Sequence, residues 1–225
     1  MTDSFGKKFL TQLLRRITGK TTVTPSSYWD AKYETSEFIY TKTANRFIVE
    51  LCEPLTLGAA IDLAGGEGRN TVWLAERGWR VENVDISGVG LQKCIEFAAE
   101  KGVAERVSVL QASGVDFKSI IAPVDLGIVP YLQVDEALLK ASLKNLVSQI
   151  KSGGHLVGVW HARENLGVDF GGPQDPAVLP SVDSMTQICA GLPVNVELCE
   201  LRDGQVQTKD GLKPSITLVL KATVL

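Results

Sequence analysis

The stretch AIDLAGGEGRNTVWLAERGWRVENVDIS, residues 60–87, decides the fold of this chain. Its short apolar start, residues 60–63, is bounded by glycines, as is typical of a parallel strand buried on both faces. A glycine-rich turn follows at once, then a helix over about 69–77, and then a second strand that ends in Asp85. This order predicts an α/β sheet with a ligand pocket at the carboxyl ends of its strands.

The glycines of the turn indicate how a ligand would approach. Gly65, Gly66 and Gly68 lack a Cβ atom, so the backbone can take positive φ and come close to a bound molecule. The helix that begins near Arg69 directs its free N–H groups toward the same point. Asp85 falls where a carboxylate accepts hydrogen bonds from both ribose hydroxyls. We therefore predict a pocket for a nucleoside.

A dinucleotide fingerprint uses the same parts, so an NAD(P)-dependent oxidoreductase is the first alternative. Two details favour another cofactor. Thr71 stands where the third glycine of GxGxxG would permit close contact between helix and strand. Asp62 and Glu67 would repel a pyrophosphate, whereas they would attract a ligand that carries a sulfonium and an ammonium group.

Here the sequence resembles the class I S-adenosylmethionine-dependent methyltransferases, whose first motif is an acid followed by alternating glycines. The matching residues are Asp62, Ala64, Gly66 and Gly68, with Ala64 in place of the usual first glycine. The stretches YWDAKYE (28–34), LAERG (74–78) and VDIS (84–87) resemble a small-molecule group that includes tellurite-resistance and thiopurine-type methyltransferases. The resemblance covers most of the chain. It implies S-adenosylmethionine as methyl donor and S-adenosylhomocysteine as product.

The resemblance also implies a Rossmann-like, seven-stranded, mostly parallel sheet with helices on both faces. An amino-terminal helical cap and a C-terminal antiparallel hairpin complete this fold. The strands after the second are expected at residues 106–113, 124–132, 154–161, 194–201 and 215–224. The hairpin turn is expected at residues 202–204, Arg-Asp-Gly.

Length and composition fit one domain over 1–225, with a helical cap region over 1–55 and a cofactor-binding core over 56–225. The apolar runs are too short to span a bilayer. A formal net charge of −3 gives no electrostatic support for a nucleic-acid partner. We expect a cytoplasmic protein whose partner is a small-molecule acceptor; the sequence assigns no oligomeric state.

The spacing of the cysteines and histidines does not match a metal-binding motif. The four cysteines lie far apart without a CxxC pair, and the two histidines lack HxxxH spacing. We therefore expect reduced thiols and no metal site.

The pattern of residues in the amino-terminal region predicts a helical cap over the core. Apolar residues recur at helical spacing over 5–17, which indicates an amphipathic helix that packs on its own domain, on a partner or on an anionic membrane. Trp29 and Tyr33 follow, before a helix expected over 41–52. In related methyltransferases such segments cover the cofactor. The two rings would then offer cation–π contacts to a sulfonium, and simple core packing is the alternative.

Further cofactor contacts are implied by the resemblance. Asp85 is expected to bind the ribose, and Ile86 is assigned to the same site. Ser113 and Gly114 are expected near the adenine, where Ser113 replaces an acid that many members carry. The turn from Asp62 to Gly68, which includes Gly65, would receive the methionine portion of the cofactor. Arg69 would contact the carboxylate of that portion.

Candidate acceptor residues lie beyond the carboxyl ends of strands four and five, toward which the methyl group would point. Tyr131 would shape the acceptor pocket, donate a hydrogen bond or only pack. Ile128 and Val129 stand where amino-methylating enzymes carry a polar residue and a proline, so adenine or amide methylation loses support. His161 titrates near neutrality as a free side chain and is the candidate base or acceptor-binding group. GGPQDP (171–176) is expected to be a lid, a substrate loop or a structural connection.

The sequence therefore predicts methyl transfer to an oxygen, sulfur or other chalcogen atom of a small molecule. Such a displacement requires alignment and exclusion of water more than catalytic side chains. An acceptor that is already an anion needs no base, whereas a hydroxyl or ammonium acceptor does. The oxidoreductase and a non-catalytic protein that binds S-adenosylmethionine stay as alternatives.

Overall fold

The computed structural model describes residues 25–35, 37–167, 172–208 and 211–225. The amphipathic helix predicted over 5–17 lies outside these residues, as does Gly171 at the start of the GGPQDP loop.

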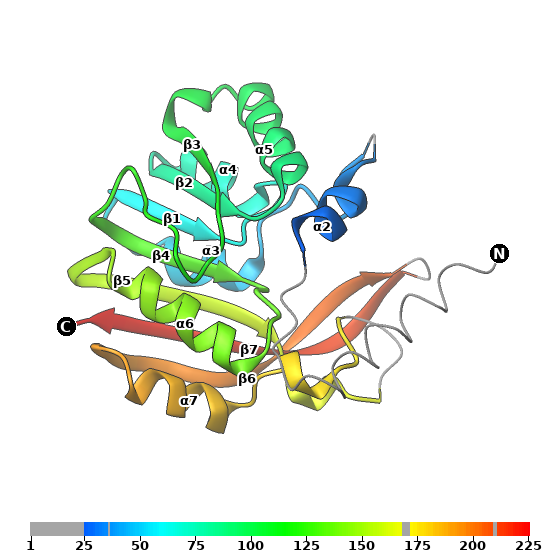
Figure 1. Cartoon of the computed structure of the whole chain (residues 1–225), viewed down its shortest axis with the longest axis vertical. Helices are drawn as coiled ribbons and strands as arrows, with labels where there is room; N and C mark the ends of the chain where they lie inside the picture. Colours follow the sequence, from blue (N-terminus) through cyan, green and yellow to red (C-terminus); the bar gives the residue numbers. More distant parts are fainter. Residues whose placement is uncertain (1–24, 36, 168–171, 209–210) are drawn as a thin grey trace.

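Seven strands form one sheet in the order β3-β2-β1-β4-β5-β7-β6 (Figure 1). Neighbours among the first five strands pair in parallel, whereas β7 is antiparallel to both β5 and β6. The predicted Rossmann-like sheet with a C-terminal antiparallel hairpin is thereby confirmed. The strands are β1 (Ala59–Leu63), β2 (Arg80–Asp85), β3 (Val107–Gln111), β4 (Val124–Pro130), β5 (Ile150–His161), β6 (Val194–Thr208) and β7 (Gly211–Val224).

Helices cover both faces of the sheet and enclose two apolar cores. Alternate strand residues serve the two sides, so that Ala60 packs with α3, α4 and α5 while Ile61 packs with α6 and α7. Figure 1 shows α6 and α7 together on the nearer face. The helices are α2 (Ser26–Tyr33), α3 (Arg46–Cys52), α4 (Arg69–Glu76), α5 (Gly88–Glu100), α6 (Glu136–Val147) and α7 (Val182–Ala190). Within the described residues, no helix is long and apolar enough to cross a membrane.

The hairpin turn predicted at residues 202–204 is wrong. These residues continue β6, and Gly204 pairs with Ser215 on β7. A Cβ atom at Gly204 would lie 2.5 Å from the Thr217 hydroxyl oxygen, so glycine here permits close side-chain approach within the ladder. Asp and Gly are frequent in turns, but here residues 202–204 pair with β7 and therefore stay in the extended strand conformation.

The helix predicted over 41–52 begins only at Arg46. Asn45 ends the preceding loop because its side-chain oxygen accepts hydrogen bonds from the backbone N–H groups of Phe47 and Ile48. An asparagine cap of this kind favours a helix start at the next residue.

Ala64 carries backbone strain directly after β1. Its φ is 60°, in the left-handed region, and its N–H donates to the Val84 carbonyl at 2.7 Å. The missing glycine of the motif is therefore tolerated, but at a conformational cost of about 1 kcal/mol.

Replacing Ala64 with glycine should raise the free energy of unfolding by up to about 1 kcal/mol, because glycine adopts positive φ without a Cβ clash. Urea unfolding followed by circular dichroism measures this change. Ala99→Gly is the matched control, since Ala99 is exposed within α5; there the same substitution should cost about 0.5–1 kcal/mol. An equal loss at both positions would contradict the account.

Candidate functional site

The glycine turn lies at the carboxyl end of β1 and leads into α4. Gly66 and Gly68 have φ of 52° and 83°, and Gly68 is the residue before the first turn of α4. A Cβ atom at Gly65 would lie 2.6 Å from the side-chain oxygen of Asn83, and one at Gly68 would clash with the Cys94 sulfur. The turn is thus packed closely against β2 and α5.

Asp62 is fully buried under this turn. Its Oδ2 accepts a hydrogen bond from the Thr71 hydroxyl at 2.6 Å, while its Oδ1 has no partner among the described residues. Burial raises the pKa of Asp62 to about 7, and the Thr71 bond opposes that rise. The sequence read Thr71 as a crowding residue; the structure shows that its hydroxyl orients the buried acid.

Asp85 closes the other side of the turn, at the end of β2. Its Oδ2 accepts from the Gly66 N–H at 3.0 Å and its Oδ1 from the Ser87 N–H at 2.8 Å. Burial raises the pKa of Asp85, and these backbone hydrogen bonds lower it. The carboxylate therefore fixes the turn relative to the start of α5.

Glu67 does not face the pocket in the way the sequence suggested. Its carboxylate pairs with the Lys93 ammonium at 2.8 Å and accepts from the Ile39 N–H at 3.1 Å. The charge of Glu67 is therefore balanced within the protein. Asp62 and Asp85 form no ion pair among the described residues, unlike Glu67.

The cap aromatics lie on α2, beyond the carboxyl ends of the parallel strands (Figure 1). Tyr33 is buried, and its hydroxyl oxygen would lie 2.5 Å from a Cβ atom at Gly66. Trp29 stacks on the Tyr33 ring, with 5.8 Å between ring centroids. Asp30 holds α2 in place by accepting from the Ser87 hydroxyl at 2.7 Å. The structure thus brings Tyr33 to the turn and Trp29 behind it.

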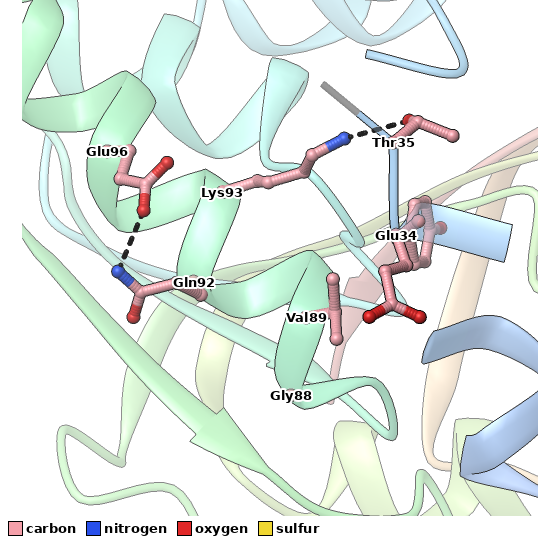
Figure 2. Close-up of a pocket in the computed structure, with 8 residues that line it drawn as sticks. Glu34, Thr35, Gly88, Val89, Gln92, Lys93 and Glu96 are labelled. Atoms are coloured by element: carbon pink, nitrogen blue, oxygen red, sulfur yellow. Dashed lines mark hydrogen bonds between the residues drawn. The ribbon is translucent and has the colours of Figure 1, made fainter. Parts of the chain in front are cut away.

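A groove of about 520 Å³ opens between the residues that follow α2 and the first turns of α5 (Figure 2). Lys93 reaches across it and donates to the Thr35 hydroxyl at 3.3 Å. Tyr33 lines both this groove and the glycine turn. The groove is lined by Tyr33, Glu34, Thr35, Gly88, Val89, Gln92, Lys93 and Glu96.

The predicted adenine contacts lie after β3, beside the end of β2. The Ala112 N–H donates to the Asp85 carbonyl at 3.0 Å, which brings the two strand ends together. Ser113 follows directly, whereas Gly114 packs toward α6, where a Cβ atom would lie 2.9 Å from the Ser142 hydroxyl. Sequence reasoning missed Gln111, whose amide donates to the Ile86 carbonyl at 3.1 Å. A polar residue at the end of a parallel strand was the available signal.

The two candidate acceptor residues lie side by side at the ends of β4 and β5. The ring centroids of Tyr131 and His161 are 4.7 Å apart, and the Arg69 guanidinium lies 5.7 Å from the Tyr131 ring. Tyr131 has φ of 62°, a strained conformation held by its N–H bond to the Val159 carbonyl at 2.8 Å. Its phenol oxygen accepts from the Asn45 amide at 3.1 Å, a second contact that the sequence did not indicate.

His161 does not titrate near neutrality as expected. Burial, and secondly the charge of Arg69, lower its pKa to about 4. Its Nδ1 is buried and has no partner among the described residues. Gly172 of the GGPQDP loop lies against the ring, since a Cβ atom there would be 2.6 Å from the His161 Cγ. His161 is therefore a neutral imidazole enclosed by loop and strand.

The described residues contain no group of three or more His, Cys, Asp or Glu side chains placed to hold a metal ion. The four cysteines are free thiols, three of them buried. Burial raises the pKa of Cys94, beside the turn, to about 12. The Cys94 thiol therefore stays protonated and inert at neutral pH.

No protein-family model matches the chain, and no curated protein matches it in sequence. Solved structures do resemble it. A protein studied for the conversion of a disulfide bond into a thioacetal group during echinomycin biosynthesis gives a TM-score of 0.72 at 16% identity, over 88% of this chain and 92% of that one. TehB from Haemophilus influenzae gives 0.65 at 14% identity, over 89% of this chain and 67% of that one.

The N-methyltransferase NodS from Bradyrhizobium japonicum WM9, in complex with S-adenosylhomocysteine, gives a TM-score of 0.66 at 14% identity, over 88% of this chain and 97% of that one. At such low identity the similarity concerns the fold. The chain therefore has the Rossmann-like fold found in S-adenosylmethionine-dependent methyltransferases.

Proposed function

We propose that this protein transfers a methyl group from S-adenosylmethionine to a small-molecule acceptor. One observation carries the proposal: Asp62 and Asp85 flank a positive-φ glycine turn at the carboxyl ends of adjacent parallel strands. The fold it shares with NodS, which was solved with S-adenosylhomocysteine, supports the same cofactor.

The residues present fit this cofactor. The buried Oδ1 of Asp62 lacks a partner among the described residues. A carboxylate oxygen of this kind can accept a hydrogen bond from the ammonium group of the cofactor's methionine portion. Asp85 is proposed to hold the ribose, with Ile86, Ser113 and Gly114 toward the adenine. When bound, S-adenosylmethionine supplies a methyl group on a positively charged sulfur. Tyr33 and Trp29 are proposed to exclude water from it.

The acceptor is proposed to lie against Tyr131 and His161. The Tyr131 oxygen already accepts a hydrogen bond from Asn45, so its own proton is available to an acceptor atom. A strained residue at a strand end is a frequent mark of a functional site. His161 contributes a neutral imidazole beside the Tyr131 ring.

Isothermal titration with S-adenosylhomocysteine tests the cofactor assignment. The wild-type protein should bind it, and Asp85→Asn should weaken binding by about tenfold, because a charge-assisted hydrogen bond to the ribose becomes neutral. Asp183→Asn, on the exposed start of α7, is the matched control and should leave binding unchanged. Binding of NAD(H) without binding of S-adenosylhomocysteine would favour the oxidoreductase alternative.

Binding should also release a proton near pH 7. The raised pKa of Asp62 leaves it partly protonated there, and a cationic ligand favours the carboxylate form. Titrations with S-adenosylmethionine in buffers of different ionisation enthalpy measure the release. Asp62→Asn should abolish it, whereas Asp183→Asn should retain it. A binding enthalpy that is independent of the buffer in wild type would contradict this coupling.

The low pKa of His161 should make stability depend on pH. The unfolded chain protonates this residue below about pH 6.5, whereas the folded chain does so only near 4. The free energy of unfolding should therefore fall as pH drops through this window, by at most about 1.4 kcal/mol per pH unit from this group. Urea unfolding at several pH values measures the slope. His161→Phe should reduce this slope; equal slopes in wild type and His161→Phe would refute the buried neutral imidazole.

A further inference from the structure

Arg69 is a half-buried cation without an acidic partner. Among the described residues its side chain makes no ion pair and no hydrogen bond, only the contact with the Tyr131 ring. Two other partly buried cations are paired: Lys93 with Glu67 at 2.8 Å, and Arg202 with Glu50 at 2.8 Å. A partly desolvated charge is costly unless an anion compensates it. Arg69 therefore indicates a position for an anion that the described residues do not supply.

That position lies at the acceptor end of the site. The guanidinium faces Tyr131 at the end of β4, and its charge reaches His161 at the end of β5. The groups around it are neutral: a phenol, an imidazole with a free nitrogen and the amide of Asn45. Asp62 also feels the charge of Arg69, but it lies fully buried beneath the turn and bonds to Thr71.

The same residues provide no strong base. A neutral imidazole with a pKa of about 4 takes up protons poorly at neutral pH, and a phenol donates rather than accepts them. An acceptor that needs deprotonation by the protein would find no suitable group here among the described residues. An acceptor that arrives already ionised needs none.

We propose that the methyl acceptor is a small acid that binds as an anion, through a carboxylate, phenolate or thiolate held by Arg69 beside Tyr131 and His161. This inference rests on the proposed function. The lone pair of the anionic atom bonds to the methyl carbon, while the carbon–sulfur bond breaks and its electron pair stays on sulfur. The anion and the sulfonium both become neutral, and no proton moves. Loss of both charges suits a site of low polarity.

The cofactor's own carboxylate is the competing anion for Arg69, as the sequence resemblance implied. The two assignments differ in what the loss of Arg69 weakens. Arg69→Met removes the charge, and Arg69→Lys restores it. Arg77→Met is the matched control, because Arg77 is the C-cap residue at the other end of α4 and its guanidinium lies 5.5 Å from the Trp73 ring. Thermal unfolding confirms that each variant is folded.

Two measurements then decide between them. Isothermal titration gives the Kd of S-adenosylhomocysteine for each protein. Ligand-observed NMR on the S-adenosylhomocysteine complex gives the binding of benzoate, 4-nitrophenolate and thiophenolate against benzamide and benzyl alcohol. Formation of S-adenosylhomocysteine from S-adenosylmethionine with the same five compounds adds turnover.

We expect at least one of the anions to bind more tightly than the neutral compounds, and more weakly as salt is raised. Arg69→Met should lower anion affinity by about tenfold or more, with partial rescue by lysine and no change in Arg77→Met. The Kd of S-adenosylhomocysteine should change less than about threefold.

Weaker S-adenosylhomocysteine binding in Arg69→Met with unchanged anion binding would assign Arg69 to the cofactor carboxylate and overturn the proposal. Absence of anion binding to wild type, or equal binding of neutral compounds, would overturn it as well. Failure of wild type to bind S-adenosylhomocysteine would instead reject the proposed function. Anion binding measured on the protein alone would then show whether the anionic-acceptor proposal fails together with the proposed function.

Discussion

The carboxylate of Asp85 holds the candidate site together, because its two oxygens accept hydrogen bonds from two separate backbone segments. One bond fixes the glycine turn through Gly66, and the other fixes the start of α5 through Ser87. The Ser87 hydroxyl in turn donates to Asp30 and so ties α2 to the sheet. The Asp85 carbonyl accepts from Ala112, which aligns the end of β3. One residue thus sets the positions of turn, cap and third strand.

Buried charges in this protein fall into two groups with different consequences. Lys93 and Glu67 compensate each other and attach the segment after α2 to the turn, since Lys93 also donates to the Glu37 carbonyl at 2.7 Å. Such a pair positions structure and has little charge left for a ligand. Asp62 and Arg69 have no ionic partner among the described residues. In the proposed function, their charges select a cationic cofactor and an anionic acceptor.

The proposed acceptor region is bordered by segments far apart in the chain. Tyr131 and His161 come from neighbouring strands, Asn45 from the start of α3, and Gly172 from the loop after β5. Strain at Tyr131 is retained because its backbone and phenol are each held by a hydrogen bond. Methyl displacement needs such a rigid, dry enclosure more than it needs an acid or a base. The neutral state of His161 agrees with that requirement.

The sequence by itself determined the glycine turn between the first two strands, because glycine spacing, hydrophobic runs and strand-end acids act locally. The later strands and the antiparallel end of the sheet followed from its resemblance to the methyltransferases. The sequence also singled out Asp62, Asp85, Tyr131 and His161, which stay predicted site residues. Only the tertiary structure decided which charges remain free: Lys93 neutralises Glu67, Thr71 orients Asp62, and burial moves the pKa of His161. The tertiary structure also shows that Arg-Asp-Gly at 202–204 belongs to strand β6. The ionic partners and the burial of a charged side chain depend on segments that folding brings together, and no local sequence pattern encodes these contacts.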